Sequence, residues 1–180
     1  MLYFHKELKE RLKSDYQIQK AVSEKKYYKI SNGLYSDKEH VNPLEIIVKK
    51  YPNAIFTGES AYYYYDLTDV IPDYFFLATS RTDTRINDKN IKQVYIPKEL
   101  LEYGKTQIEI ENVKINIYDK ERILIDLIRN KNTIPFDYYK EIINNYRKIA
   151  DELDIYKIQE YISHYKNEKT LYDTLQREVF

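Results

Sequence analysis

The spacing of apolar residues predicts a small head of two helices and a two-stranded ribbon at the start of the chain. Apolar positions recur every three or four residues over 4–12 and over 16–24, which is the period of a helix with one buried face. Residues 27–30 show a short strand pattern, and 34–36 form the return strand. The Ser-Asn-Gly sequence at 31–33 predicts the turn between them, because Asn-Gly accepts the positive φ angles of tight hairpins. Two helices followed by a ribbon indicate a winged helix-turn-helix.

The remainder of the chain has the pattern of a larger domain that begins after a polar linker. Residues 36–42 are polar, so we expect a head at 1–38 and a main domain at 43–180. Pro43 suits the first turn of a helix over 44–50, since a proline there costs no hydrogen bond.

The segment at 57–72, TGESAYYYYDLTDVIP, is the predicted centre of the main domain. It follows a strand pattern at 54–56 and begins with a glycine turn. Glu59 and Ser60 lie at the start of a short helix, where an acid or a hydroxyl satisfies free backbone N–H groups. Four consecutive tyrosines then cover every face of one helical turn, which predicts that this helix is packed on more than one side.

Strand patterns fill the middle of the main domain and helical patterns fill its end. The predicted strands are 74–79, 91–96 and two within 108–117 that meet at a hairpin turn over 111–112. The predicted helices are 119–130, one that starts at Pro135, 153–165 and 170–179. The predicted fold class is therefore α+β: a reduced N-terminal winged helix-turn-helix, then a mixed, largely antiparallel sheet with C-terminal helices.

Charge is balanced over the whole chain but not along it. There are 29 basic and 29 acidic residues, which excludes a generally polycationic nucleic-acid coat. Residues 1–40 carry nine Lys or Arg and six Asp or Glu, a net charge of about +3, and the remainder carries the matching negative charge. A basic head on a mildly acidic body indicates phosphate binding at the head.

The sequence shows no feature of secretion or membrane insertion. Cysteine is absent, which excludes disulfides, thiolate metal ligands and cysteine nucleophiles. No apolar run approaches the length of about 18 residues that a membrane span needs. The first residues also lack the apolar core and cleavage site of a signal peptide. We therefore expect a cytoplasmic protein.

The second predicted helix has an apolar back and a polar front, which suits the major groove of double-stranded DNA. The candidate base-reading side chains on this front are Gln17, Gln19, Lys20 and Ser23. The candidate phosphate contacts, on the basic turn and ribbon that follow, are Lys25, Lys26, Lys29 and Asn32. The alternative is a small amphipathic cap whose lysines simply face water.

Three segments carry a family resemblance through their order and spacing. They are a wing-like ISNGLY at 30–35, the pattern G-x-S-A-x-x-x-x-x-L-T-x-x-I-P within 57–72, and an E-R-x-L-x-D-L helix within 119–129. Together they make the chain, from about residue 5 to residue 165, similar to the AbiEi antitoxins of the abortive-infection (type IV) toxin–antitoxin systems, which act in phage defence.

The resemblance implies an antitoxin that binds its own operator, acts as a transcriptional repressor and counters a cognate nucleotidyltransferase-like toxin without a stable complex. The chain departs from that pattern in one respect. Some fifteen residues precede the candidate recognition helix, where a full winged helix usually has two helices. This short head favours a competing hypothesis, a protein-interaction module that does not bind DNA.

Motifs for catalysis are absent or incomplete. His5, His40 and His164 lie far apart and show no metal-ligand spacing. Pro72-Asp73 matches the first half of a metal-dependent nuclease motif, but no [DE]-x-K follows it. A degenerate nuclease, whose metal-dependent cleavage Asp73→Ala would abolish, is the weaker alternative.

Two charged features in the family-like segments have structural explanations. Arg122 and Asp126 stand four residues apart and predict an ion pair within one helix. Glu59 is explained as an acid at a helix start, where the helix dipole favours it. We therefore predict no catalytic residue, no metal and no cofactor, and a non-enzymatic protein.

Overall fold

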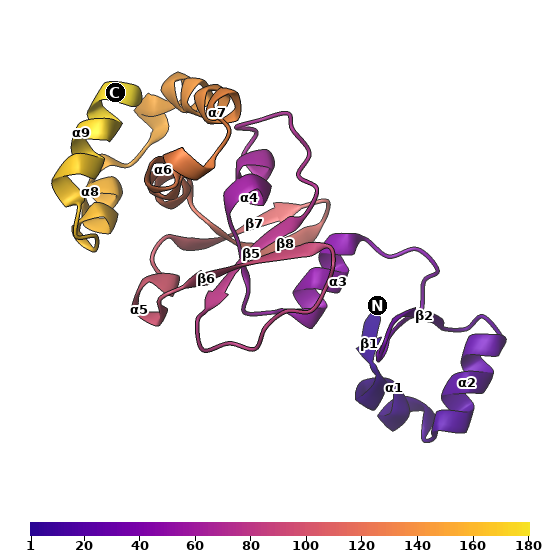
Figure 1. The fold of residues 1–180 in the computed structure, drawn as a ribbon. Coiled ribbons are helices and arrows are strands. Elements are labelled where there is room, and N and C mark those ends of the chain that lie inside the picture. The colour runs from indigo at the N-terminus through magenta and orange to yellow at the C-terminus, as the bar shows by residue number, and fades with distance from the viewer. The chain divides into compact units, whose positions relative to one another are not determined.

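The computed structural model describes residues 1–180 and divides them into two compact units (Figure 1). The N-terminal unit is Met1–Pro52 and the C-terminal unit is Asn53–Phe180. The division therefore lies after the helix that Pro43 begins, whereas the sequence pattern placed it before that helix.

The N-terminal unit combines helices with a small antiparallel sheet. Its elements are β1 (Leu2–Phe4), α1 (His5–Leu12), α2 (Asp15–Ser23), β2 (Tyr28–Ser31), β3 (Leu34–Ser36) and α3 (Pro43–Lys50). The strands pair in the order β1-β3-β2, and both pairings are antiparallel. Leu8 of α1, Ile18 of α2 and Leu34 of β3 are almost fully buried, and the three elements form one apolar centre.

Strand β1 corrects the predicted first helix. The helix begins at His5, and Phe4 lies in β1 opposite Leu34 of β3, with 39% of its surface exposed. Phe4 and Leu8 are four residues apart, which is also the spacing of two residues on one face of a helix. A strand of three residues is too short to show an alternating pattern, and its conformation depends on pairing with a strand far along the chain.

The other predicted elements of this unit are confirmed within a residue or two. Ser14 caps α2, and the Asn-Gly turn joins β2 to β3, with Gly33 in the left-handed region at φ +71°. Helix α3 begins at Pro43 as predicted, and the side chain of Asn42 caps it by accepting a hydrogen bond from the Leu44 N–H.

The C-terminal unit contains five strands and most of the helices. Its sheet region consists of β4 (Ile55–Phe56), α4 (Gly58–Tyr64), β5 (Phe75–Ser80), β6 (Ile91–Ile96), α5 (Lys98–Leu101), β7 (Lys105–Ile110) and β8 (Val113–Tyr118). Its helical region consists of α6 (Lys120–Arg129), α7 (Phe136–Lys148), α8 (Ile155–Ser163) and α9 (Glu168–Glu178), with short 3₁₀ turns at Lys131–Thr133 and Ala150–Glu152.

The five strands form one mixed sheet in the order β6-β5-β4-β8-β7. The β6–β5 and β4–β8 pairs are parallel, and the β5–β4 and β8–β7 pairs are antiparallel. The α+β class, the mixed sheet and the C-terminal helices are confirmed. Antiparallel pairs, which we expected to dominate, are matched by parallel ones, because β4 pairs with β8 from far along the chain and such pairing leaves no local signal.

The hairpin between β7 and β8 turns where the alternation slips. Glu111 and Asn112 are its two central residues, with φ of 50° and 64°. Positive φ at both central positions defines the type I′ turn, whose twist matches that of the strands it connects. The break in the alternation of apolar and polar residues at 111–112 therefore predicted the position of the turn correctly.

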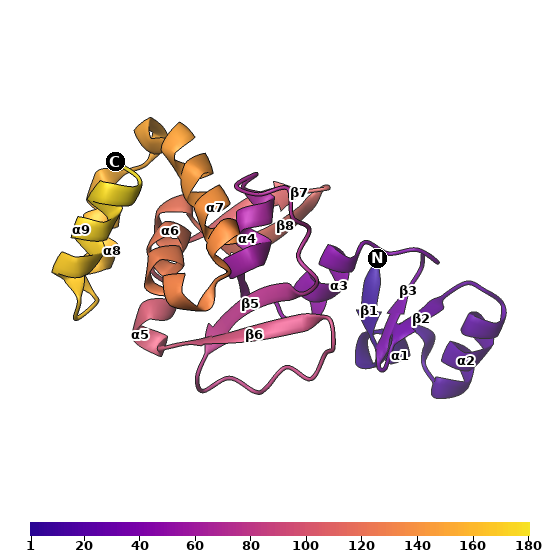
Figure 2. The same ribbon diagram turned by 45° about the horizontal axis from the view of Figure 1, so that its top comes forward.

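Helix α6 lies at the centre of the helical layer. Figures 1 and 2 show α4, α6 and α7 on one face of the sheet, with α8 and α9 beyond α6. Helix α6 contacts α4, α8 and α9, and Ile123, Leu124 and Leu127 on it are fully buried. Of the four tyrosines at 62–65, Tyr62 is buried and the other three are half-buried, so α4 is covered on more than one side.

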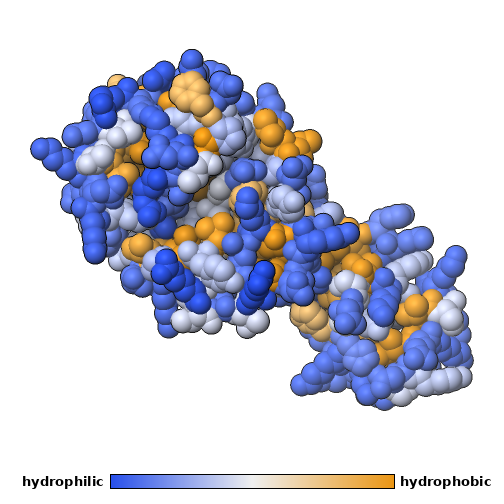
Figure 3. Space-filling model, viewed as in Figure 1, coloured by the Kyte–Doolittle hydropathy of each residue, from blue (hydrophilic) through white to orange (hydrophobic).

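Polar side chains cover most of the surface that Figure 3 presents, with apolar residues scattered among them. None of the helices combines the length and the apolar character needed to span a bilayer.

Candidate nucleic-acid interface and the α6 ion-pair network

Helix α2 presents a polar face to solvent. The Ser14 Oγ accepts a hydrogen bond from the Gln17 N–H at 3.2 Å, which begins the helix, and Ile18 and Ala21 are buried. The four candidate base-reading side chains are all exposed: Gln17, Gln19, Lys20 and Ser23. The helix therefore has the apolar back and polar front that the sequence predicted.

The turn after α2 and the ribbon expose the four candidate phosphate contacts. Lys25 and Lys26 follow the last residue of α2, Lys29 lies in β2, and Asn32 lies in the hairpin turn. All four side chains are exposed. The structure thus places all eight candidates on the surface of one unit, and contact with DNA stays a prediction.

Part of this basic charge is paired with Glu24, the residue at the C-terminal end of α2. The Lys26 ammonium lies 2.7 Å and the Lys20 ammonium 3.9 Å from its carboxylate oxygens. The hydrogen bond from Lys26 lowers the pKa of Glu24 and raises the pKa of Lys26. Glu24 therefore competes with any phosphate for these two lysines.

Ser23 is also partly engaged. Its hydroxyl donates to the Lys20 carbonyl at 2.7 Å, within the last turn of α2. Of the four base-reading candidates, Ser23 is therefore the one whose donor is already used, and its oxygen remains as an acceptor.

A basic stripe along α1 and its C-terminal end, and an exposed tyrosine, were not predicted from the sequence. Lys6, Lys9 and Lys13 line a shallow depression together with Glu10. Their spacing of three and four residues was the available signal, because it places them on one helical face. Tyr16, at the start of α2, is 71% exposed. In a helix-turn-helix the first helix crosses the phosphate backbone, so these lysines are further candidates for phosphate contact.

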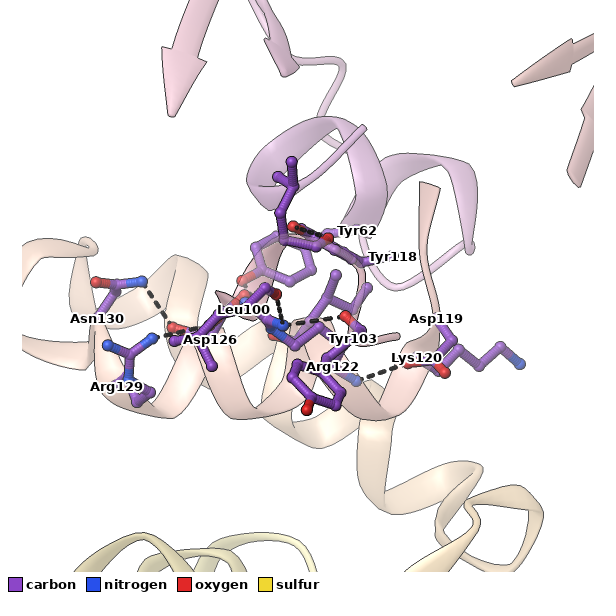
Figure 4. A network of polar contacts seen from close by, with 12 residues as sticks. Tyr62, Leu100, Tyr103, Tyr118, Asp119, Lys120, Arg122, Asp126, Arg129 and Asn130 are labelled. Carbon is purple, nitrogen blue, oxygen red and sulfur yellow. Dashed lines mark hydrogen bonds and ion pairs between the residues drawn. The ribbon is translucent and has the colours of Figure 1, made fainter. Parts of the chain in front are cut away.

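In the C-terminal unit, the predicted pair between Arg122 and Asp126 is present but is buried, with Arg122 1% exposed. The Arg122 Nε donates to Asp126 at 3.0 Å, and Nη1 donates to the carbonyls of Leu100 and Tyr103 at 2.9 and 3.0 Å (Figure 4). Arg129 donates to the other oxygen of Asp126 at 3.0 Å. This network ties α6 to the segment between β6 and β7.

The acids at the start of α6 hold it to neighbouring segments. Asp119 caps the helix by accepting from the Arg122 N–H at 2.9 Å, and it also accepts from the Tyr161 hydroxyl at 2.9 Å. Burial raises the pKa of Asp119, although these hydrogen bonds oppose the shift. Glu121 accepts from the Asp154 N–H at 2.9 Å. The charged side chains of α6 are therefore engaged in hydrogen bonds and ion pairs within the unit.

Asp73 is the one acid that the sequence offers for the nuclease alternative. Asp73 is exposed and lies between α4 and β5. No three His, Asp or Glu side chains gather in an arrangement that could hold a metal ion. Glu59 lies in the first turn of α4, at the helix-start position predicted for it.

Comparison with models of known protein families found no match, and comparison with curated protein sequences found none either.

Proposed function

We propose that this chain is an AbiEi-like antitoxin whose N-terminal unit binds the operator of its own operon and represses transcription. The observation that carries the proposal is the arrangement of that unit. Two helices accompany a sheet in the order β1-β3-β2, α2 exposes a polar face, and the turn and ribbon that follow it expose Lys25, Lys26 and Lys29. A helix with such a face fits the major groove, and a ribbon beside it fits the phosphate backbone.

The three family-like segments support the second half of the proposal. They fall on the β2–β3 hairpin, on α4 and on α6, and α4 contacts α6. In this proposal the α4 and α6 segments act through the shape of the unit and not through catalysis. We therefore propose a non-enzymatic, cytoplasmic antitoxin that counters a nucleotidyltransferase-like toxin without forming a stable complex with it.

The short head does not lack a third helix. Helix α3, which follows the ribbon, contacts β1, and its Lys49 forms an ion pair with Glu7 of α1 at 2.8 Å. The Lys49 ammonium also lies 5.0 Å from the centre of the Phe4 ring. A helix after the ribbon thus supports β1 and α1, where a full winged helix has one before them.

The test is a salt titration of binding to a duplex that carries the protein's own upstream region, against a scrambled duplex. The double variant Lys25→Ala, Lys26→Ala should bind every duplex more weakly and reduce the slope of log K against log salt by about one, because a lost phosphate contact removes about 0.9 from it and Lys26 is paired with Glu24. The matched control is Lys140→Ala, Lys169→Ala, which removes two exposed lysines from the C-terminal unit.

Unchanged affinity and slope in the Lys25, Lys26 variant would refute the assigned interface. Failure of the wild type to bind either duplex at low salt would favour the second candidate, a protein-interaction module. The observation in favour of that candidate is the pairing of basic with acidic side chains on the head, which includes Lys9 with Asp15 as well as Lys20 and Lys26 with Glu24.

A further inference from the structure

A cavity of about 520 Å³ lies in the C-terminal unit between one side of the sheet and the helical layer. Its floor comes from the parallel pair β5–β6, where the register sets Phe76 opposite Lys92. Val94 and Ile96 follow Lys92 at steps of two, so they share its face of the sheet. Helices α4, α6 and the start of α7 form the walls. The volume lies within the range of small-molecule sites.

The cavity is positively charged in a chain whose net charge is zero. Four basic side chains line it (Arg81, Lys92, Arg122 and Arg129) against two acidic ones (Glu59 and Asp126). Asp126 is already paired with both Arg122 and Arg129. Arg81 and Lys92 have no acidic partner, which leaves their charges available to an anion.

Two buried donors of the wall have no acceptor in the protein. The Nη2 amino group of Arg122 is buried and makes no hydrogen bond, although Nε and Nη1 of the same side chain are fully engaged. The hydroxyl of Tyr165 is in the same state. Buried donors in folded proteins are nearly always paired, so two in one cavity wall call for an acceptor from outside the chain.

Aromatic side chains also line the cavity. Phe76 lies on the floor with the Lys92 ammonium 4.9 Å from its ring centre, and Tyr62 and Tyr138 also line the cavity. Aromatic faces stack on planar groups, and nucleobases stack on them whatever their sequence. Basic groups and rings thus occur together in the lining of one cavity.

We propose that this cavity binds a free mononucleotide. Its phosphate meets Arg81 and Lys92, its ring lies among the aromatic side chains, and its acceptors satisfy the buried donors of Arg122 and Tyr165. This proposal concerns the C-terminal unit alone, and it holds whether or not the N-terminal unit binds DNA.

The test is calorimetric titration of the full chain with AMP, adenosine, inorganic phosphate and a 5′-phosphorylated dinucleotide. We expect AMP to bind at least tenfold more tightly than adenosine or phosphate alone, since each of these offers only half of the recognised chemistry. The double variant Arg81→Gln, Lys92→Gln should lose at least tenfold in AMP affinity. Lys140→Gln, Lys169→Gln is the matched control, because it removes two charges outside the cavity and should bind as the wild type does.

A second variant separates shape from charge. Val94→Phe keeps every charge and fills the floor, so it should weaken AMP binding while circular dichroism shows the native fold. Absence of AMP binding, or equal loss in the Lys140, Lys169 control, would overturn the proposal. Phosphate binding as tight as that of AMP would refute the role of the rings. Tighter binding of the dinucleotide than of AMP would also contradict the proposal, because the ligand would then be the 5′ end of a nucleic-acid strand and not a free mononucleotide.

Discussion

At the scale of single residues, the buried guanidinium of Arg122 requires hydrogen-bond acceptors from the segments around it. A buried guanidinium is costly unless its donors are paired, and the chain provides Asp126 on the same helix and two carbonyls from the segment before β7. To reach those carbonyls the backbone must pass close to α6. It does so at Gly104, whose carbonyl accepts from the Asp119 N–H at 2.7 Å.

Gly104→Ala should therefore destabilise the C-terminal unit. A Cβ at this position would lie 2.5 Å from the Cβ of Arg122, and φ is +75°, in the region that favours glycine. The left-handed backbone costs about 1–2 kcal/mol for a residue with a Cβ, and overpacking adds about 1–3 kcal/mol. Urea denaturation followed by circular dichroism measures the loss.

Gly58→Ala is the control for Gly104→Ala. Gly58 lies in the same unit at φ +51°, but its nearest neighbour for a Cβ is a Phe76 carbon at 3.4 Å, which is ordinary contact. This variant should show only the backbone cost. Equal losses in the two variants would mean that the approach to Arg122 contributes nothing.

The sequence predicted the pair of Arg122 with Asp126 but not its burial. Spacing along a helix tells which side chains are neighbours on that helix, and it carries no information about the segment opposite. For the same reason the requirement for glycine at 104 and the occurrence of Arg81 and Lys92 in the lining of one cavity could not be predicted, because both depend on segments brought together by the fold.

At the scale of elements, α2 shows how well an amphipathic helix can be predicted. Its buried face and its exposed face both follow from local sequence, and both are confirmed. Strand β1 was missed because three residues paired with a distant strand leave no local pattern. The proposed contact of α2 with DNA involves a local feature as well, the acid Glu24 at the C-terminal end of the helix.

Glu24→Gln should strengthen DNA binding by the N-terminal unit. The substitution removes one negative charge from the proposed interface and releases Lys20 and Lys26, which then meet phosphates. We expect an affinity several-fold higher at low salt and a salt slope steeper by about one to two, since each new phosphate contact adds about 0.9. Fluorescence anisotropy with a labelled duplex measures both quantities.

Glu39→Gln is the matched variant, since Glu39 is an exposed acid of the same unit with no ion pair. It should raise affinity only through the change in net charge, and therefore less than Glu24→Gln does. If both variants gave the same increase, the Glu24 ion pairs would have no bearing on DNA binding.

At the scale of the whole molecule, the core depends heavily on tyrosine. The chain has 21 tyrosines, and burial raises the pKa of Tyr62 and Tyr146 well above the ordinary value and that of Tyr64 and Tyr138 to about 12. Tyr146 donates to the Lys120 carbonyl at 2.9 Å, between α7 and α6. Folding therefore requires these hydroxyls to be neutral.

This requirement predicts how stability depends on pH in the alkaline range. In the unfolded chain a tyrosine ionises near its ordinary pKa of about 10. Above that pH the unfolded chain has lost protons that the folded chain still holds, so stability is complete below about pH 10 and falls as the pH rises through the higher folded values. Absorbance at 295 nm should therefore show exposed tyrosines ionising first and the buried ones only together with loss of the circular dichroism signal.

Tyr146→Phe should reduce this pH dependence at the cost of one hydrogen bond, whereas Tyr156→Phe, at a site 84% exposed, should leave it unchanged. Ionisation of all tyrosines in one step near pH 10, with the fold intact, would contradict the burial on which the prediction depends.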